Sequence, residues 1–176
     1  EAPNWLKNSS AMIFNSQGHI FRYDLDTGEE TLIDSGACED CNNDHVVSPD
    51  ETKIAVSHMG GRTLSDGRSA FTSEIYIIPM EGGEAKKVSA QPLCFLHGWS
   101  PDGKTLAYCG IDPTAGWGHA DVFTVPADGS LTLTKLTDAG YNDGCEYSPD
   151  GEYIWYHSTR AGLMQVWRMK ADGSEQ

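Results

Sequence analysis

Histidine, amide and carboxylate side chains stand shortly before a Ser-Pro-Asp triplet in successive stretches of this sequence. The triplets begin at Ser48, Ser100 and Ser148. The side chains before them that form a candidate ligand site are Asn42, Asp44, His45, His97, Asp143 and Glu146. Imidazole, amide and carboxylate groups bind polar ligands, and they also ligate divalent metals. One expectation is therefore a divalent metal held by His45 and His97.

The same histidines have a structural interpretation. On a strand, side chains alternate between two faces, so His45 shares a face with Val47 and His97 shares one with Trp99. Those faces are apolar and are typical of a core between neighbouring repeats. The histidines would then hydrogen-bond between repeats, and Glu146 would face a different environment. The sequence leaves both interpretations open.

The elements that must position these residues form a repeat. The three triplets lie roughly 50 residues apart, which is the length of one four-stranded propeller blade. Each triplet precedes a short strand pattern, at 53–57, 104–108 and 153–157. A second run of β-branched and aromatic residues follows each of these strands, at 74–78, 121–125 and 165–169. Tight-turn residues then predict hairpins into outer strands at 85–89 and 132–137.

A fourth unit without the triplet precedes the others. It begins near Trp5 and carries strand patterns at 12–15, 19–25 and 31–34. We therefore predict one all-β propeller domain over 1–176. Its four blade-like repeats span approximately the following ranges: 3–36, 41–90, 92–139 and 141–176. The last repeat lacks an outer strand, which leaves an unpaired edge and predicts a larger propeller or a homo-oligomer joined through terminal blades.

Two local features predict departures from regular repeats. Glu51 occupies the place that Gly103 and Gly151 hold in the other triplet turns, so we expect an altered turn there. Long connections at 58–73 and 110–120 are predicted to be loops, which are frequent locations of function. Within them, Arg62 and Trp117 are candidates for contacting a carboxylate-bearing or sugar-like ligand. Simple surface insertion is the alternative.

Composition restricts the partners. The net charge of −14 disfavours nucleic acid and anionic membranes, and no apolar run is long enough to insert into a membrane as a helix. Five cysteines cannot all pair within one chain, which favours a reducing compartment such as the cytoplasm. The close pair Cys38 and Cys41 has no second pair nearby and is interpreted as an incidental loop pair.

Several stretches resemble TolB-type β-propeller repeats: 44–50, 97–108, 147–151 and 167–174. The resemblance covers almost the whole chain and implies a bacterial propeller, usually of six or seven blades. It implies a non-catalytic module that binds a protein partner or a small or saccharide ligand at the channel mouth. It also implies a periplasmic or secreted location if a leader is removed.

Some propellers similar to TolB are enzymes, so a second function stays open. The alternative is a polysaccharide lyase or a hydrolase-associated domain whose channel metal is held by His45 and His97. The sequence shows no Ser-His-Asp set and no phosphate-binding loop. Binding is therefore favoured over catalysis.

Overall fold

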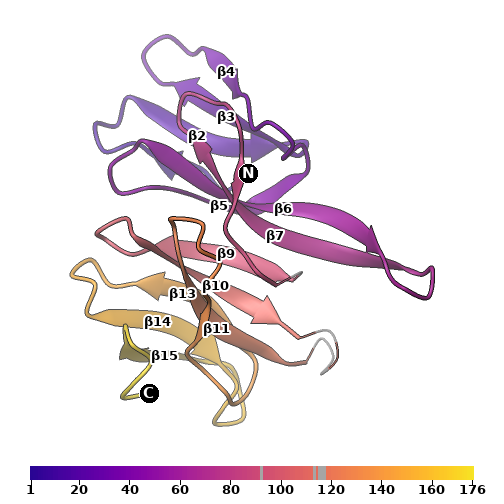
Figure 1. The fold of residues 1–176 in the computed structure, drawn as a ribbon. Coiled ribbons are helices and arrows are strands. Elements are labelled where there is room, and N and C mark those ends of the chain that lie inside the picture. Colours follow the sequence, from indigo (N-terminus) through magenta and orange to yellow (C-terminus); the bar gives the residue numbers. More distant parts are fainter. Residues whose placement is uncertain (92, 113, 115–117) are drawn as a thin grey trace.

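Four antiparallel sheets follow one another along the molecule from the N-terminus to the C-terminus (Figure 1). The computed structural model describes residues 1–91, 93–112, 114 and 118–176. These residues form strands and turns, and they contain no helix able to span a membrane. The predicted all-β architecture of propeller blades is confirmed, including three strands in the last sheet.

Each strand pairs with its neighbour in the sequence, as expected for blades built from hairpins. The first sheet contains β1 (Asn4–Trp5), β2 (Ala11–Ser16), β3 (His19–Asp24) and β4 (Glu30–Ile33). The second contains β5 (Cys41–Val47), β6 (Lys53–Thr63), β7 (Ser69–Pro79) and β8 (Lys86–Lys87). The third contains β9 (Cys94–Trp99), β10 (Thr105–Ile111), β11 (Ala120–Pro126) and β12 (Thr134–Lys135). The fourth contains β13 (Asn142–Tyr147), β14 (Tyr153–Ser158) and β15 (Gln165–Lys170).

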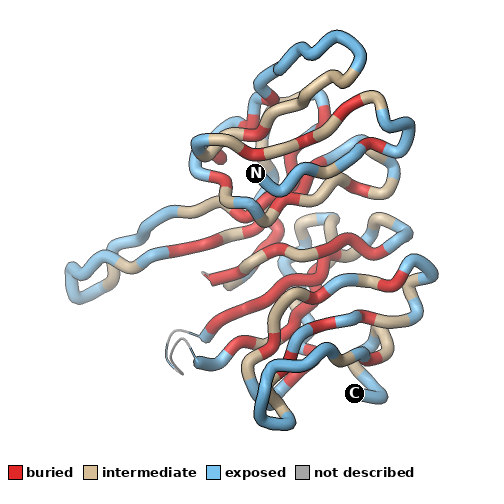
Figure 2. The backbone as a smooth tube through the Cα atoms, turned by 180° about the vertical axis from the view of Figure 1, so that it is seen from behind, coloured by how far each residue is buried: buried red, intermediate tan, exposed pale blue. Residues whose placement is uncertain are grey.

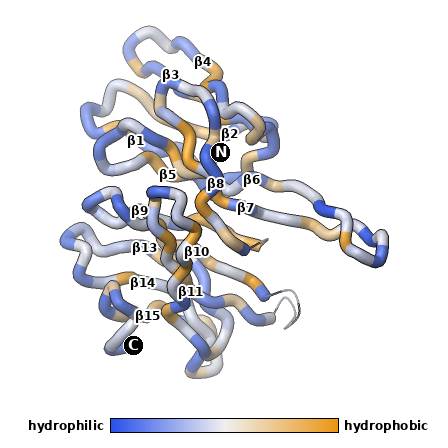
Figure 3. Tube along the Cα trace, in the orientation of Figure 1, coloured by the Kyte–Doolittle hydropathy of each residue, from blue (hydrophilic) through white to orange (hydrophobic). Residues whose placement is uncertain are grey.

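Apolar cores fill the seams between consecutive sheets. Ile13 of the first sheet packs in one core with Ile54 of the second, and corresponding clusters lie at the next two seams. Buried residues alternate with more exposed ones along β14 of the last sheet, whereas β10 of the third sheet is buried on both faces because it lies between two seams. Buried and apolar residues follow the strands in the body of the molecule, whereas the turns are exposed and hydrophilic (Figures 2 and 3). Burial between sheets therefore holds the blades side by side.

The Ser-Pro-Asp triplets form one recurring hydrogen-bonded turn. The Ser48 hydroxyl donates to Asp50 Oδ1 at 2.7 Å, and the two later triplets repeat this contact at 2.6 Å. The backbone N–H of Lys53 donates in turn to Ser48 Oγ at 3.0 Å. The Thr52 backbone N–H and hydroxyl also donate to Asp50 Oδ1, and together with the Ser48 bond they lower the pKa of Asp50 to about 2. The turn thus fixes where each inner strand ends and the next strand begins.

The expectation of an altered turn at Glu51 is wrong. Glu51 has a φ of 58°, within the left-handed region that Gly103 occupies with a φ of 70°. Its N–H donates to the Ser48 carbonyl at 2.9 Å, as the N–H of Gly103 does to Ser100 at 2.8 Å. The Glu51 side chain accepts a hydrogen bond from the Lys7 backbone N–H of the first sheet. This contact between sheets compensates for the backbone conformation, which normally favours glycine.

The expected loop at 58–73 is largely strand, which corrects that prediction. β6 and β7 are paired from Lys53 and Pro79 as far as Thr63 and Ser69. The outer part of this hairpin projects from the body of the molecule (Figure 1). Glycines and small polar residues in this stretch hide the strand pattern, whereas cross-strand pairing maintains the ladder. At the second long connection, Ile111 pairs with Ala120, and part of the segment between them lies outside the described residues.

Candidate functional site

Three inner strands carry the candidate residues, and each has a β-bulge at that place. We call β1, β5, β9 and β13, the first strand of each sheet, the inner strands; β9 contacts both β5 and β13. Their pairing with the second strands shifts between Cys41 and His45, around His97, and between Asp143 and Glu146. A bulge re-aims side chains locally. Positions that match along the sequence therefore need not point in the same direction.

A histidine–carboxylate pair joins the third and fourth sheets. His97 Nε2 lies 2.9 Å from Asp143 Oδ1, and the same oxygen accepts the Gly144 N–H at 2.9 Å. Both side chains are partly exposed. The hydrogen bond from His97 lowers the pKa of Asp143, although partial burial opposes the shift. This pair is the electrostatic centre of the candidate site.

Two further carboxylates flank the pair. Asp44 accepts a hydrogen bond from Asn42 Nδ2 at 2.9 Å, and burial raises the pKa of Asp44 while nearby His97 opposes that shift. Burial likewise raises the pKa of Glu146, and His97 again opposes it. Gly98 leaves room for this carboxylate, because a Cβ there would lie 3.3 Å from Glu146 Oε2. Carboxylates from the second and fourth sheets thus lie near one imidazole of the third, and Asp143 alone contacts it directly.

Asp44, His97 and Glu146 line a pocket of about 440 Å³, which we call the inner-strand pocket. Its lining residues are Ala2, Pro3, Asn4, Asn43, Asp44, His45, Val46, Leu96, His97 and Glu146. The structure therefore brings Asp44, His97 and Glu146 together. Asp143 joins them through its hydrogen bond to His97, and Asn42 through its bonds with Asp44.

His45 plays a different part from His97, although both lie before the same turn. Its residue is only 2% exposed, and its carbonyl accepts a hydrogen bond from Asn4 Nδ2 at 3.0 Å across the first seam. Backbone groups of Ile13 and Asn42 lie near the ring, but neither ring nitrogen has a hydrogen bond of normal geometry in the described structure. Burial lowers the pKa of His45. A neutral ring packed within the seam follows from these surroundings.

The divalent metal remains a proposal without further support from geometry. Among the residues that the structure describes, no three histidine, cysteine, aspartate or glutamate side chains are grouped so that they could hold a metal ion. His97 instead uses Nε2 for its contact with Asp143. Among the described residues, His45 and His97 thus have no third side chain grouped with them that could complete a metal site.

The two candidates from the long connections lie elsewhere. Arg62 is exposed on the projecting part of the β6–β7 hairpin and does not line the inner-strand pocket. Trp117 lies outside the described residues. Sequence reasoning missed Asn4, which lines the pocket and bonds to the His45 carbonyl. The first repeat lacks the triplet, so an alignment on the triplet serine could not reach this residue.

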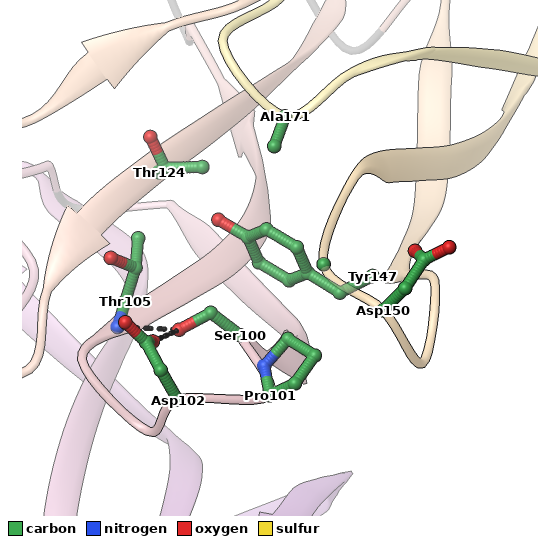
Figure 4. Close-up of a pocket in the computed structure, with 9 residues that line it drawn as sticks. Ser100, Pro101, Asp102, Thr105, Thr124, Tyr147, Asp150 and Ala171 are labelled. Carbon is green, nitrogen blue, oxygen red and sulfur yellow. Dashed lines mark hydrogen bonds between the residues drawn. The ribbon is translucent and has the colours of Figure 1, made fainter.

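A second concave region lies at the turn ends of the third and fourth sheets. This groove of about 480 Å³ is lined by Ser100, Asp102, Thr124, Tyr147 and Asp150 with neighbouring residues, and the Tyr147 ring extends across it (Figure 4). Burial raises the pKa of Tyr147 to about 12. Both carboxylates already accept bonds within their own turns. A smaller pocket of about 210 Å³ repeats this arrangement at the preceding seam, which indicates a by-product of blade packing.

Comparison with known proteins identifies the architecture. No protein-family model matches the chain. An uncharacterised protein of Agrobacterium fabrum is 39% identical over 176 residues, which cover 99% of this chain and 56% of that protein. The structure of a protein provisionally named TolB from Agrobacterium tumefaciens is 38% identical, with a TM-score of 0.85 over 99% of this chain and 59% of that one.

The chain has the fold of TolB-like β-propeller proteins. TolB from Acinetobacter baumannii shares this fold at 18% identity, with a TM-score of 0.74 over 99% of the present chain and 42% of that protein. The chain thus spans little more than half of the Agrobacterium proteins that it matches. Its four TolB-like sheets correspond to part of a larger propeller chain in each of them.

Proposed function

We propose that these TolB-like blades form a binding module whose inner-strand pocket takes a positively charged group of a ligand. The observation that carries the proposal is the pair of His97 and Asp143, flanked by Asp44 and Glu146 in one site. The ligand is a protein segment with an exposed lysine or arginine, or a small or saccharide ligand with an amino group.

The electrostatics support a cationic ligand. Burial raises the pKa values of Asp44 and Glu146, which means that their charged forms lose hydration in the folded protein. An ammonium or guanidinium group placed beside them would restore a favourable environment for both charges. The net charge of −14 would also attract cationic ligands over a longer range.

The chemistry of the neighbouring groups favours binding over catalysis. The one hydrogen-bond partner found for His97 in the described structure is a carboxylate, so His97 does not activate a hydroxyl or thiol there. Burial raises the pKa values of Cys109 and Cys145 well above their ordinary range, which disfavours reactive thiolates. A metal-dependent lyase would also need several metal-ligating side chains close together, and the described residues contain no group of three such side chains.

The experiment is a titration with two tripeptides, glycyl-arginyl-glycine and its citrulline analogue, which has the same shape without the charge. We expect the arginine peptide to bind the wild-type protein more tightly. The double substitution Asp44→Asn with Glu146→Gln should reduce its affinity to that of the citrulline peptide. Asp128→Asn is the matched control, because this carboxylate is exposed in a turn and does not line the pocket. Equal binding of both peptides to the wild type would contradict the proposal.

A further inference from the structure

The surroundings of the His97 ring are set by strands on both sides of it. His97 lies on β9, the inner strand of the third sheet, and β9 contacts β5 of the second sheet and β13 of the fourth. Its side chain is 22% exposed and lines the inner-strand pocket. The ring lies near Asp44 of β5 and Glu146 of β13, and a positive charge on it would lower the pKa of both carboxyls. Described residues on either side therefore define the environment of this imidazole.

Asp143 contacts the ring and is itself held in place. Its Oδ1 lies 2.9 Å from His97 Nε2 and accepts the Gly144 N–H at 2.9 Å. Gly144 has a φ of 60°, and a Cβ there would lie 2.8 Å from His157 Nδ1, so this bulge requires glycine. The Cys109 thiol also lies near the carboxylate and lowers its pKa. Asp143 does not line the pocket, so it acts on a ligand there through His97.

The contact between Asp143 and His97 decides which ring nitrogen carries the proton. Since the pKa of Asp143 is lowered, mainly by the hydrogen bond from His97, the carboxylate is ionised at neutral pH and can only accept hydrogen bonds. His97 Nε2 is therefore the donor across the contact of 2.9 Å. In a neutral imidazole the second nitrogen is then an acceptor, and Nδ1 has no hydrogen bond among the residues that the structure describes. The ring thus keeps one acceptor for a ligand.

The other histidine of the pocket has no such arrangement. Both ring nitrogens of His45 are buried, and neither has a hydrogen-bond partner in the described part of the chain. No carboxylate fixes the proton of His45 on one nitrogen, and its residue is only 2% exposed. An acceptor for a ligand is therefore expected on His97 rather than on His45.

We propose that Asp143 fixes the proton of His97 on Nε2 and that Nδ1 accepts a hydrogen bond from the cationic group of the ligand. The pocket then selects ammonium or guanidinium groups, which carry N–H donors, over quaternary ammonium groups, which carry none. The inference rests on the proposed function, because it assumes a cation in the same pocket. Asp143 is a positioning residue in this arrangement, and His97 contacts the ligand.

A doubly protonated His97 is the competing state. Both ring nitrogens would then be donors, and the ring would carry a positive charge beside Asp143. Such a ring offers no acceptor and repels a cationic ligand. The position of the ring protons therefore separates the two states.

The first test measures those protons by nitrogen-15 magnetic resonance of the histidine rings at pH 8. The His97 signals are assigned by their loss in His97→Gln. We expect Nε2 to be protonated and Nδ1 to be unprotonated in the wild type. In Asp143→Ala the two signals should move towards each other, because the proton is then shared between both nitrogens. Asp138→Ala is the matched control, because it removes an exposed carboxylate that does not line the pocket.

The second test compares glycyl-lysyl-glycine with its Nε-trimethyl-lysine analogue, which has the same charge without the N–H donors. Calorimetric titration should show that the wild type binds the lysine peptide at least about tenfold more tightly, the effect of one hydrogen bond to a charged group. The lysine peptide should also shift the Nδ1 signal of His97, and the trimethylated peptide should not.

Two substitutions of His97 show which ring nitrogen matters. Glutamine reaches as far as Nε2 and can keep the contact with Asp143, whereas asparagine places an amide oxygen near the position of Nδ1. The preference for the lysine peptide should therefore fall more in His97→Gln than in His97→Asn. Circular dichroism checks that each variant is folded.

The outcomes distinguish this inference from the proposed function. A proton on Nδ1 in the wild type, equal affinity for the lysine and trimethyl-lysine peptides, or an Nδ1 signal that the lysine peptide does not shift would overturn the inference. Binding that requires charge but no N–H donor would refute it and leave the proposed function standing. Failure of the proposed function is seen separately, as equal binding of the arginine and citrulline peptides.

Discussion

Trp99→Ala should be a severe core truncation. Trp99 is 7% exposed, packs in the core between the second and third sheets, and donates from Nε1 to the Val46 carbonyl at 3.0 Å. Removing a buried tryptophan side chain costs about 3–5 kcal/mol, because the apolar contacts are lost and a cavity remains. The loss of the hydrogen bond adds about 1 kcal/mol. We therefore expect the free energy of unfolding to fall by at least about 3 kcal/mol.

The measurement is equilibrium unfolding in urea followed by far-ultraviolet circular dichroism, with the slope of the transition compared between variants. Trp99→Phe keeps much of the apolar volume and loses the bond to Val46, so its cost should be about 1–2 kcal/mol. Trp155→Ala is the matched control at a partly exposed tryptophan and should cost about 1 kcal/mol or less. If Trp99→Ala lowered the free energy of unfolding no more than Trp155→Ala does, the conclusion that Trp99 stabilises the core between the second and third sheets would be refuted.

Two further predictions concern the turn at Glu51 and the buried histidine. Glu51→Gly should change the free energy of unfolding by less than about 1 kcal/mol, because relief of the positive φ offsets the lost hydrogen bond to Lys7. In the same urea assay, Gly103→Glu should destabilise the protein measurably, because it places a side chain at a positive φ. Because burial holds the folded-state pKa of His45 below its unfolded value of about 6.5, unfolding takes up a proton below that pH, and stability should fall as the pH drops. His45→Leu should reduce this loss between pH 7 and 5; an unchanged pH profile would show that another group titrates.

The repeat architecture could be predicted because its signals are local. A triplet such as the one at Ser48 contains the donors and acceptors of its own turn, and alternation along 153–157 marks the buried face of β14 without knowledge of any neighbour. The missing outer strand after β15 follows from the same pattern. Local information failed at Glu51, because the compensating contact comes from Lys7, which lies in the turn between β1 and β2 of another repeat.

The candidate site could be predicted only in part. Its residues could be located before the triplets, but their directions depend on the bulges. His45 pairs with Val56, whereas His97 lies at the shift in β9 and turns to Asp143 in the next sheet. No sequence pattern shows which residue of an inner strand is left out of the ladder.

The sequence by itself determined the sheets, their order and the polar residues of the inner strands, since these depend on alternation and turn chemistry within each repeat. Only the tertiary structure decided that His97 contacts Asp143 near two further carboxylates, whereas His45 is packed in a seam. It also decided that Trp99 of the third sheet donates its Nε1 hydrogen to the Val46 carbonyl of the second. Both outcomes depend on the partners that the adjacent sheet provides for a side chain, and those partners are far away in the sequence.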